Sequence, residues 1–320
     1  MDNLVEVKNL KKYFYQGSGP FKKKEAIKAL DDVSFYIKRN EILGLVGESG
    51  CGKTTCGKLI LRLINPTAGS IYFDGHDITH LRPKQMNEFR KKMMIIYQDP
   101  YGSLDPRMTI GAAIAEPIEV HKLAATKEEK ENKIIELMEK VGLTPDQINR
   151  YPHEFSGGQR QRIGIARALA TNPIFIVADE PVSALDVSIQ AQIINLLKDL
   201  QKDFGLTLLF ITHDLSVIKH TSDRIAVMYA GKLVELASKQ DLFHEPMHPY
   251  TRALLSAIPI PDPEYQTKYI PLTGEVPSLV HPPPGCRFHP RCTEARPECS
   301  QNESELREVK KDHFVACFPT

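Results

Sequence analysis

The first 47 residues contain short runs in which apolar positions alternate with polar ones or follow one another without a break. These runs are LVEVKNL, DDVSFYI and EILGLVG, and such patterns are typical of strands with one or both faces buried. We expect antiparallel strands that lead into one fully buried strand. Further along, SIYFDGHDI places Asp-Gly between two short β-like pieces, which predicts a hairpin.

Helical spacing begins in the middle of the chain. Apolar positions recur three and four residues apart over 126–141, and helices are also predicted over 158–170 and 187–204. Between them, the apolar runs IFIVAD (174–179) and LTLLFITHD (206–214) are too short for helices and resemble buried parallel strands. This alternation predicts an α/β fold, with a mixed sheet and helices on both of its faces.

The amino-acid composition of the chain changes after Leu255. Thirteen of the 23 prolines lie between Pro246 and Pro319, and HPPPG at 281–285 is excluded from a helix interior. We expect a domain boundary near residue 256, which separates a large domain (1–255) from a small irregular C-terminal domain (256–320).

The length and amino-acid composition of the chain limit which classes of function are possible. The 320 residues provide enough chain for one large domain and a smaller one. The 41 basic and 40 acidic residues nearly cancel, which argues against nucleic acid or an anionic membrane surface as the main partner. No apolar run approaches the roughly 18 residues that cross a bilayer, and no signal segment opens the chain. We therefore expect an unexported protein whose six cysteines do not form disulfides.

A phosphate-binding loop is predicted at Gly47–Thr55. GESGCGKTT follows an apolar strand, precedes a helical segment and matches G-x-x-x-x-G-K-[ST]. Its glycines allow backbone N–H groups to face phosphate oxygens, while Lys53 reaches the outer phosphates and Thr54 ligates Mg²⁺. The alternative, a glycine-rich turn with an exposed lysine, is not favoured between a strand and a helix. The predicted nucleotide-binding residues of the loop are Gly47, Ser49, Gly50, Cys51, Gly52, Lys53, Thr54 and Thr55.

Two carboxylates end the strand IFIVADE. Asp179 suits the water shell of a bound Mg²⁺, and Glu180 can accept a proton from an attacking water molecule. His213 ends the next apolar run, and we expect it at the same edge of the sheet, where it contacts the γ-phosphate. The alternatives are surface charge for the carboxylates and helix capping or packing for the histidine.

A second helix start is predicted in FSGGQRQRIGIARAL. Ser156 and Gln159 form a capping box around Gly157 and Gly158. A helix N-terminus is an anion site, and one nucleotide needs only one P-loop. The second anion site therefore suggests a nucleotide site that two chains build together.

These motifs, in this order, resemble those of ABC-transporter ATPases. The matching positions are the P-loop at 47–55, the Q-loop glutamine Gln98, the signature at 156–159, Asp179 with Glu180, the D-loop SALD at 183–186, and the switch histidine His213. The resemblance implies ATP and Mg²⁺ as cofactors, with Gln98 as a further Mg²⁺ ligand. It also implies that Phe14 stacks on adenine, although Tyr13 and Tyr15 adjoin it, and that residues 99–166 form a helical subdomain.

The same resemblance implies a mechanism and partners. Two ATPase domains pair head to tail, ATP closes the dimer, and hydrolysis reopens it. We therefore expect a second ATPase subunit, two membrane permease subunits and a peripheral location at the cytoplasmic face of the cell membrane. No nucleic acid partner is expected.

The stretch HPYTRALLSAIPIPDP, 248–263, narrows the range of solutes that the transporter could carry. It is similar to the C-terminal extension of the ATPases of oligopeptide, dipeptide and nickel importers, and the chain resembles the F-type partner of such pairs. A peptide-binding protein outside the cell is then an indirect partner. Dipeptides, oligopeptides and nickel chelates remain open as solutes, and a soluble ABC ATPase acting on ribosomes or DNA, or a redox-gated ATPase, remains an alternative.

Four cysteines are clustered in the tail: Cys286, Cys292, Cys299 and Cys317. Four thiolates suit tetrahedral Zn²⁺ or a [4Fe–4S] cluster. Zinc sites favour closely paired cysteines, whereas the wide spacing here favours the cluster. A zinc site, with His289 and His313 as further ligands, and unliganded thiols both remain open.

Overall fold

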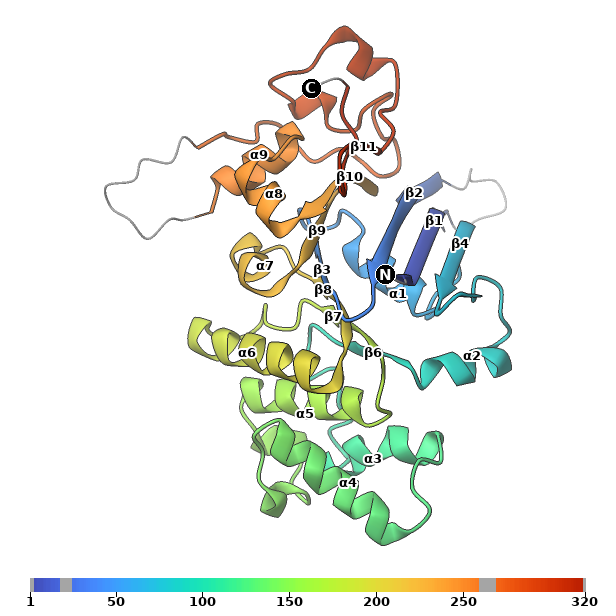
Figure 1. Cartoon of the computed structure of the whole chain (residues 1–320), viewed down its shortest axis with the longest axis vertical. Coiled ribbons are helices and arrows are strands. Elements are labelled where there is room, and N and C mark those ends of the chain that lie inside the picture. Colours follow the sequence, from blue (N-terminus) through green and yellow to red (C-terminus); the bar gives the residue numbers. More distant parts are fainter. Residues whose placement is uncertain (1–2, 18–24, 259–268, 319–320) are drawn as a thin grey trace. The chain divides into compact units, whose positions relative to one another are not determined.

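The computed structural model describes residues 3–17, 25–258 and 269–318 (Figure 1). The chain divides into two compact units. The first unit comprises residues 1–38, 42–80 and 212–320, and the second comprises residues 39–41 and 81–211. Part of the importer-like stretch 248–263 lies outside the described residues.

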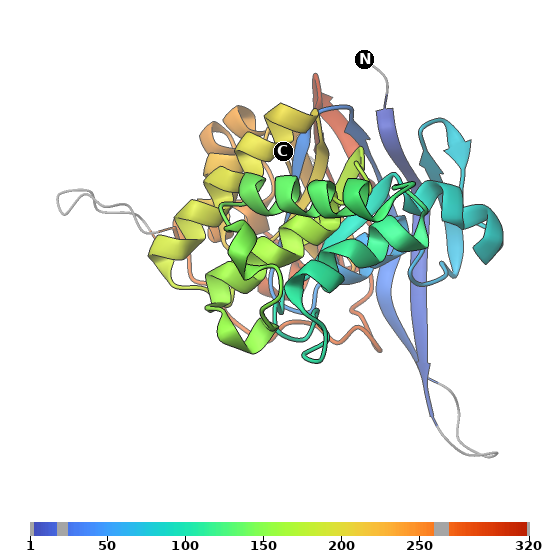
Figure 2. The ribbon, with the colours of Figure 1, turned by 90° about the horizontal axis from the view of Figure 1, so that it is seen from below.

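The first unit contains an antiparallel sheet, as the sequence predicts. Its strand order is β2-β1-β4-β5, formed by β1 (Asn3–Gln16), β2 (Glu25–Lys38), β4 (Ala68–Phe73) and β5 (His76–Asp77). Figure 2 shows β1 and β2 as a long paired ribbon. The predicted hairpin is confirmed: Asp74 and Gly75 join β4 to β5 with φ angles of 52° and 76°, the left-handed values that favour Asp-Gly in such turns.

A second group of strands in this unit surrounds β3 (Ile42–Val46), which is buried at every position as predicted. The strand order is β11-β12-β10-β9-β3, with β9 (Arg224–Tyr229), β10 (Lys232–Ser238), β11 (Arg307–Lys310) and β12 (His313–Val315). Only β3 and β9 pair in parallel. The helices of the unit are α1 (Lys53–Ile60), α7 (Leu215–Thr221), α8 (Lys239–His244) and α9 (Pro249–Ser256).

The tail after α9 is mostly irregular in its described part. It forms two short strands, β11 and β12, and two 3₁₀ turns, η3 (His289–Arg291) and η4 (Pro297–Ser300). Because β12 pairs with β10, the tail extends a sheet of the first unit. The domain boundary near residue 256 stays a prediction.

The second unit has a parallel core of order β8-β7-β6, formed by β6 (Met93–Ile96), β7 (Phe175–Asp179) and β8 (Thr207–Ile211). Every position of β7 and β8 is buried, as expected of the two apolar runs. The helices are α2 (Pro83–Arg90), α3 (Ile110–Val120), α4 (Lys127–Lys140), α5 (Gly157–Leu169) and α6 (Val187–Phe204), with 3₁₀ turns η1 (Pro145–Gln147) and η2 (Pro152–Glu154).

The three predicted helices are confirmed as α4, α5 and α6, and their ends follow from local chemistry. Thr126, Ser156 and Asp186 accept hydrogen bonds from backbone N–H groups as N-caps. The glycine that ends α6, Gly205, has a left-handed φ of 60°. Helix α5 contacts α3, α4 and α6, so it forms the centre of the helical layer of this unit (Figure 2). Within the described part of the chain, no helix combines the length and the apolar character needed to span a bilayer.

Candidate nucleotide and cysteine sites

The P-loop joins β3 to α1 in the first unit, and two of its glycines are required by geometry. At Gly47, with φ of 150°, an added Cβ would lie 2.1 Å from the Met228 carbonyl oxygen. At Gly52, with φ of 109°, it would lie 2.4 Å from the Ala29 carbonyl oxygen. Any side chain at either position would displace the backbone, so the sequence motif reflects a steric requirement of this turn.

Lys53 is the first residue of α1, and its ammonium group lies inside the loop. Its side chain is buried, and Nζ donates to the carbonyl oxygens of Gly47 (2.7 Å) and Glu48 (3.0 Å). A cation at a helix N-terminus, beside a tight glycine loop, is an anion cradle. Thr54 and Thr55 follow in the first turn and are half-buried, and Ser49 and Gly50 are exposed. Burial raises the pKa of the Cys51 thiol, so this cysteine favours its unreactive protonated form.

Three aromatic residues follow one another near the end of β1. The Phe14 ring is 40 % exposed, and the Lys12 ammonium lies 4.9 Å from its centroid. Tyr13 differs because its hydroxyl donates to Asp31 at 2.5 Å. Tyr15 is 62 % exposed. The adenine contact of Phe14 stays a prediction.

The second unit contains the carboxylates at the end of β7. Asp179 is buried, and the N–H of Glu180 donates to the carbonyl of Ile211 at 2.9 Å. Gln98, which lies just after β6, donates from Nε2 to Oε2 of Glu180 at 2.9 Å. Glu180 also has a left-handed φ of 47°, a conformation that costs a non-glycine residue about 1–3 kcal/mol and is concentrated at functional sites.

The signature motif forms the start of α5, also in the second unit. Ser156 Oγ accepts from the N–H of Gln159 (3.3 Å), and Gln159 Oε1 accepts from the N–H of Ser156 (3.0 Å). This reciprocal pair is the predicted capping box. Ser156 and Gly157 are exposed, whereas Gly158 is buried, and a Cβ there would lie 2.5 Å from Ile189. The helix start is therefore both fixed in shape and open to a ligand.

His213 follows β8 and belongs to the first unit with the P-loop. Its side chain is exposed, and the next residue, Asp214, caps α7. The predicted site residues are thus divided between the units: the P-loop, Phe14 and His213 lie in the first, and Gln98, Asp179, Glu180 and the signature lie in the second. Of these, the structure brings Gln98 and Glu180 into direct contact.

The four tail cysteines line one cavity of about 80 Å³ in the first unit. Cys299 is buried, and Cys286, Cys292 and Cys317 are half-buried and free of disulfides. Burial raises the pKa of the Cys286 and Cys292 thiols, and burial together with the neighbouring cysteines raises that of Cys317 to about 11. Within residues 3–17, 25–258 and 269–318, no group of three or more His, Cys, Asp or Glu side chains could hold a metal ion.

Residues 286–292, here called the cysteine segment, contain two arginines that are functional candidates and that no sequence motif marks. Arg291 donates to both carboxylate oxygens of Glu48 in the P-loop, and this hydrogen bonding raises the pKa of the guanidinium. Arg287 pairs with Asp31, the acceptor of Tyr13. Their positions beside Cys286 and Cys292 give no sign of these partners, because the two acidic residues lie 256 and 243 positions away in the sequence.

Comparisons with known proteins show the family to which this chain is similar. Residues 30–183 match the family model described as ABC transporter, and residues 234–299 match that of the oligopeptide/dipeptide transporter C-terminal region. The chain is 52 % identical to the oligopeptide transport ATP-binding protein AppF of Bacillus subtilis (strain 168), over 99 % of this chain and 97 % of that protein. It is also 52 % identical to the oligopeptide transport ATP-binding protein OppF of that strain, over 99 % and 96 % of the two chains.

A solved structure shares the fold. The ATP-binding cassette MJ0796, in a dimeric post-hydrolysis state bound to ADP and phosphate, superimposes with a TM-score of 0.66 at 32 % sequence identity. The match covers 73 % of this chain and 98 % of that one. A second structure of the same cassette, also dimeric, gives a TM-score of 0.66 at 31 % identity, with the same coverage.

Proposed function

This chain belongs to the family of ABC-transporter ATP-binding proteins of peptide import, and we propose that it hydrolyses ATP to power peptide uptake through a membrane transporter. The observation that carries the proposal is the P-loop, in which two positions sterically restricted to glycine hold Lys53 at the start of α1. The peptide as solute is supported by the similarity of residues 234–299 to the peptide-transporter C-terminal region. No observation favours the ribosome-acting, DNA-acting or redox-gated alternatives.

For the chemical step, we assign the general base to Glu180. It would accept a proton from water while the water oxygen bonds to the γ-phosphorus and the bond to the β–γ bridging oxygen breaks, giving ADP and phosphate. The hydrogen bond from Gln98 at 2.9 Å supports this role, because it fixes the direction of one carboxylate oxygen. His213 is assigned to the γ-phosphate and Phe14 to adenine.

Magnesium is assigned to Thr54, Gln98 and Asp179. Hydroxyl, amide and carboxylate oxygens are the hard donors that Mg²⁺ prefers, and the Nε2 of Gln98 is the atom that contacts Glu180, so its amide oxygen suits a metal. Bound Mg²⁺ would neutralise charge that develops on the phosphates. Thr54, Gln98 and Asp179 would hold the ion, and Glu180 and His213 would orient the reacting groups.

The signature helix supports an assembly of more than one chain. The exposed start of α5 at Ser156 and Gly157 is suited to the phosphates of a nucleotide held by a second ATPase subunit. We propose a head-to-tail pair of ATPase subunits on two membrane permeases, at the cytoplasmic face of the membrane, with an external peptide-binding protein as an indirect partner.

We propose that Cys286, Cys292, Cys299 and Cys317 hold a [4Fe–4S] cluster, because all four line one cavity. In this structure their side chains do not themselves form a metal-binding group. Four thiols around one small cavity are the donor set of such a cluster. Zinc is the alternative that the test distinguishes. The full chain, purified anaerobically, should contain about four iron and four sulfide per chain. A content of one zinc per chain would instead show that the four cysteines bind zinc. Cys286→Ser should lose the iron, and Cys56→Ser, at a cysteine outside the cavity, should keep it.

The function itself is tested with the chain assembled with its membrane subunits in vesicles. Lys53→Ala should abolish ATP hydrolysis and the uptake of labelled di- and oligopeptides together. Lys84→Ala, an exposed lysine on α2, should change neither. Hydrolysis without peptide uptake in the wild-type assembly would contradict peptides as the solute, and uptake by Lys53→Ala would contradict ATP as the energy source.

A further inference from the structure

The segment between Cys286 and Cys292 contacts the P-loop directly. Arg291, at the end of η3, donates to Glu48 from Nη1 to Oε2 (2.7 Å) and from Nη2 to Oε1 (3.1 Å). Glu48 is the second residue of the P-loop. The Arg291 side chain is only 6 % exposed and that of Glu48 24 %. Removing either partner therefore leaves a poorly solvated charge, which makes such a pair strongly sensitive to substitution.

The backbone of Glu48 is held at the same place. Its N–H donates to the hydroxyl of Tyr250 at 3.0 Å, and its carbonyl accepts from Lys53 Nζ at 3.0 Å. Tyr250 is fully buried, and its ring lies 5.4 Å from that of Phe288, in the cysteine segment. A displacement of this segment would thus reach Glu48 through its side chain and through Tyr250, and Lys53 through the Glu48 carbonyl.

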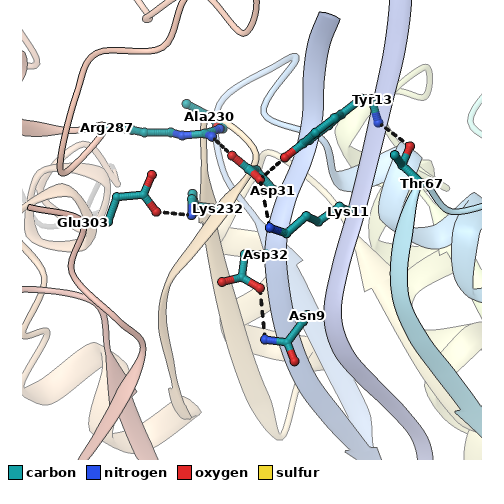
Figure 3. A network of polar contacts seen from close by, with 10 residues as sticks. All are labelled: Asn9, Lys11, Tyr13, Asp31, Asp32, Thr67, Ala230, Lys232, Arg287 and Glu303. Atoms are coloured by element: carbon teal, nitrogen blue, oxygen red, sulfur yellow. Dashed lines mark hydrogen bonds and ion pairs between the residues drawn. The ribbon is translucent and has the colours of Figure 1, made fainter.

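The second arginine reaches β1 indirectly, through Asp31 of β2. Arg287 is 4 % exposed, donates to the Ala230 carbonyl at 2.5 Å and pairs with Asp31. Figure 3 shows the Arg287 guanidinium and the Tyr13 hydroxyl converging on the Asp31 carboxylate. Tyr13 immediately precedes Phe14. The cysteine segment is therefore tied both to the phosphate loop and to the strand that carries the predicted adenine contact.

We propose that Arg291, through Glu48, and Arg287, through Asp31, are positioning residues of the ATP site, so that the tail segment sets the affinity of this chain for nucleotide. The inference rests on the proposed function, because it takes the P-loop to be the ATP site. Neither arginine contacts the reacting atoms. Lysine at position 291 would replace arginine only in part, since its point charge does not reproduce the paired hydrogen bonds.

The test measures the Kd of the full-length chain for a fluorescent ATP analogue, together with KM and kcat. Arg291→Met should raise both Kd and KM on the order of tenfold, because the P-loop loses its fixed geometry, while kcat changes less than about twofold. Arg291→Lys should give a smaller increase. Lys310→Met is the matched control: it breaks a 2.5 Å pair with Glu245 that ties the tail to the end of α8, but both side chains are exposed. The control should bind nucleotide as the wild type does.

A double variant separates positioning from a general loss of structure. Glu48→Gln combined with Arg291→Met should bind nucleotide no more weakly than the weaker single variant, because both substitutions remove the same interaction. Additive losses, or a wild-type Kd in Arg291→Met, would overturn the inference. If Arg291→Met does not fold, Arg291→Lys and the double variant supply the same comparison. A wild-type chain that binds no nucleotide would instead refute the proposed function.

Discussion

Gln98 and Glu180 lie 82 positions apart in the sequence, yet Gln98 Nε2 donates a 2.9 Å hydrogen bond to Glu180 Oε2. The contact joins the residues that follow β6 and β7, two adjacent parallel strands of the second unit. Because the carboxyl ends of parallel strands meet at one edge of the sheet, residues from separate motifs come together there. The left-handed backbone of Glu180 is held at the same edge by its N–H bond to Ile211.

Glu180→Gln should abolish steady-state hydrolysis and leave nucleotide binding intact. The amide keeps the size of the side chain and a hydrogen-bonding group toward Gln98, but it is a poor proton acceptor, so turnover should fall by about 10²–10⁴. Phosphate release and the Kd for a fluorescent ATP analogue measure the two properties. Glu128→Gln, at an exposed position of α4, is the control and should hydrolyse normally. Near-normal turnover in Glu180→Gln would refute its role as the base.

Ser156→Ala tests whether the signature serine does more than cap a helix. The substitution removes the cap of α5 and should cost about 1 kcal/mol of stability. Thr126→Ala removes the equivalent cap of α4, where Thr126 Oγ1 accepts from the Glu129 N–H at 3.1 Å, and it should cost a similar amount. Only Ser156→Ala should lower ATP hydrolysis by the assembled transporter. Equal turnover in the two variants would reduce Ser156 to a structural role.

Gly52→Ala tests the steric basis of the P-loop. The added Cβ would meet the Ala29 carbonyl at 2.4 Å and require a left-handed φ of 109°, so nucleotide binding should be lost. Gly164→Ala is the matched control, because Gly164 lies inside α5 with no atom within 4 Å of its added Cβ. It should bind nucleotide normally and gain up to about 1 kcal/mol of helix stability. Melting temperatures check that the two variants remain folded.

The strands, the hairpin and the helix caps that the sequence predicted correctly depend on local chemistry. The burial of β3 and β7, the hairpin at Asp74 and the caps at Thr126 and Ser156 each depend on patterns within a few residues. Such patterns act through side-chain periodicity and backbone preference, which a single sequence displays directly. The P-loop was predictable from its motif, although the carbonyl groups that require its glycines belong to Ala29 and Met228, which are distant in the sequence.

The connections of the tail were not predictable in this way. Arg287 and Asp31 are 256 positions apart, and Arg291 and Glu48 are 243 apart. Nothing local in the sequence pairs these charges, because their burial follows from the tertiary packing of Phe288 against Tyr229 and Tyr250. A tail rich in proline and poor in apolar residues therefore resembled an independent appendage, whereas it contributes buried contacts to the P-loop.

A buried carboxylate on β10 makes the first unit sensitive to acid. Glu235 is fully buried, accepts the N–H groups of Met247 (2.8 Å) and His248 (3.0 Å), and lies 2.8 Å from His313 Nε2. Burial by itself raises the pKa of this carboxyl, but the hydrogen bonds from His313, Thr251 and the two amides outweigh it, so the folded pKa lies below the ordinary 4.5. The stabilisation by Glu235 is therefore complete above about pH 4.5 and is lost as the pH falls through the folded pKa.

Glu235→Gln should lower the free energy of unfolding near pH 7 by about 3–5 kcal/mol, because one partner of a buried pair is removed. The difference from the wild type should shrink as the pH falls below 4.5, since the wild-type carboxylate is then protonated. Urea denaturation from pH 7 to pH 3 measures this difference. Burial lowers the pKa of His248 to about 4, and the Glu235 carboxylate opposes this shift, so His248 contributes to the same pH range. Glu245→Gln, at an exposed ion pair with Lys310, is the control. A wild-type minus Glu235→Gln difference that is constant with pH would refute a depressed pKa for Glu235.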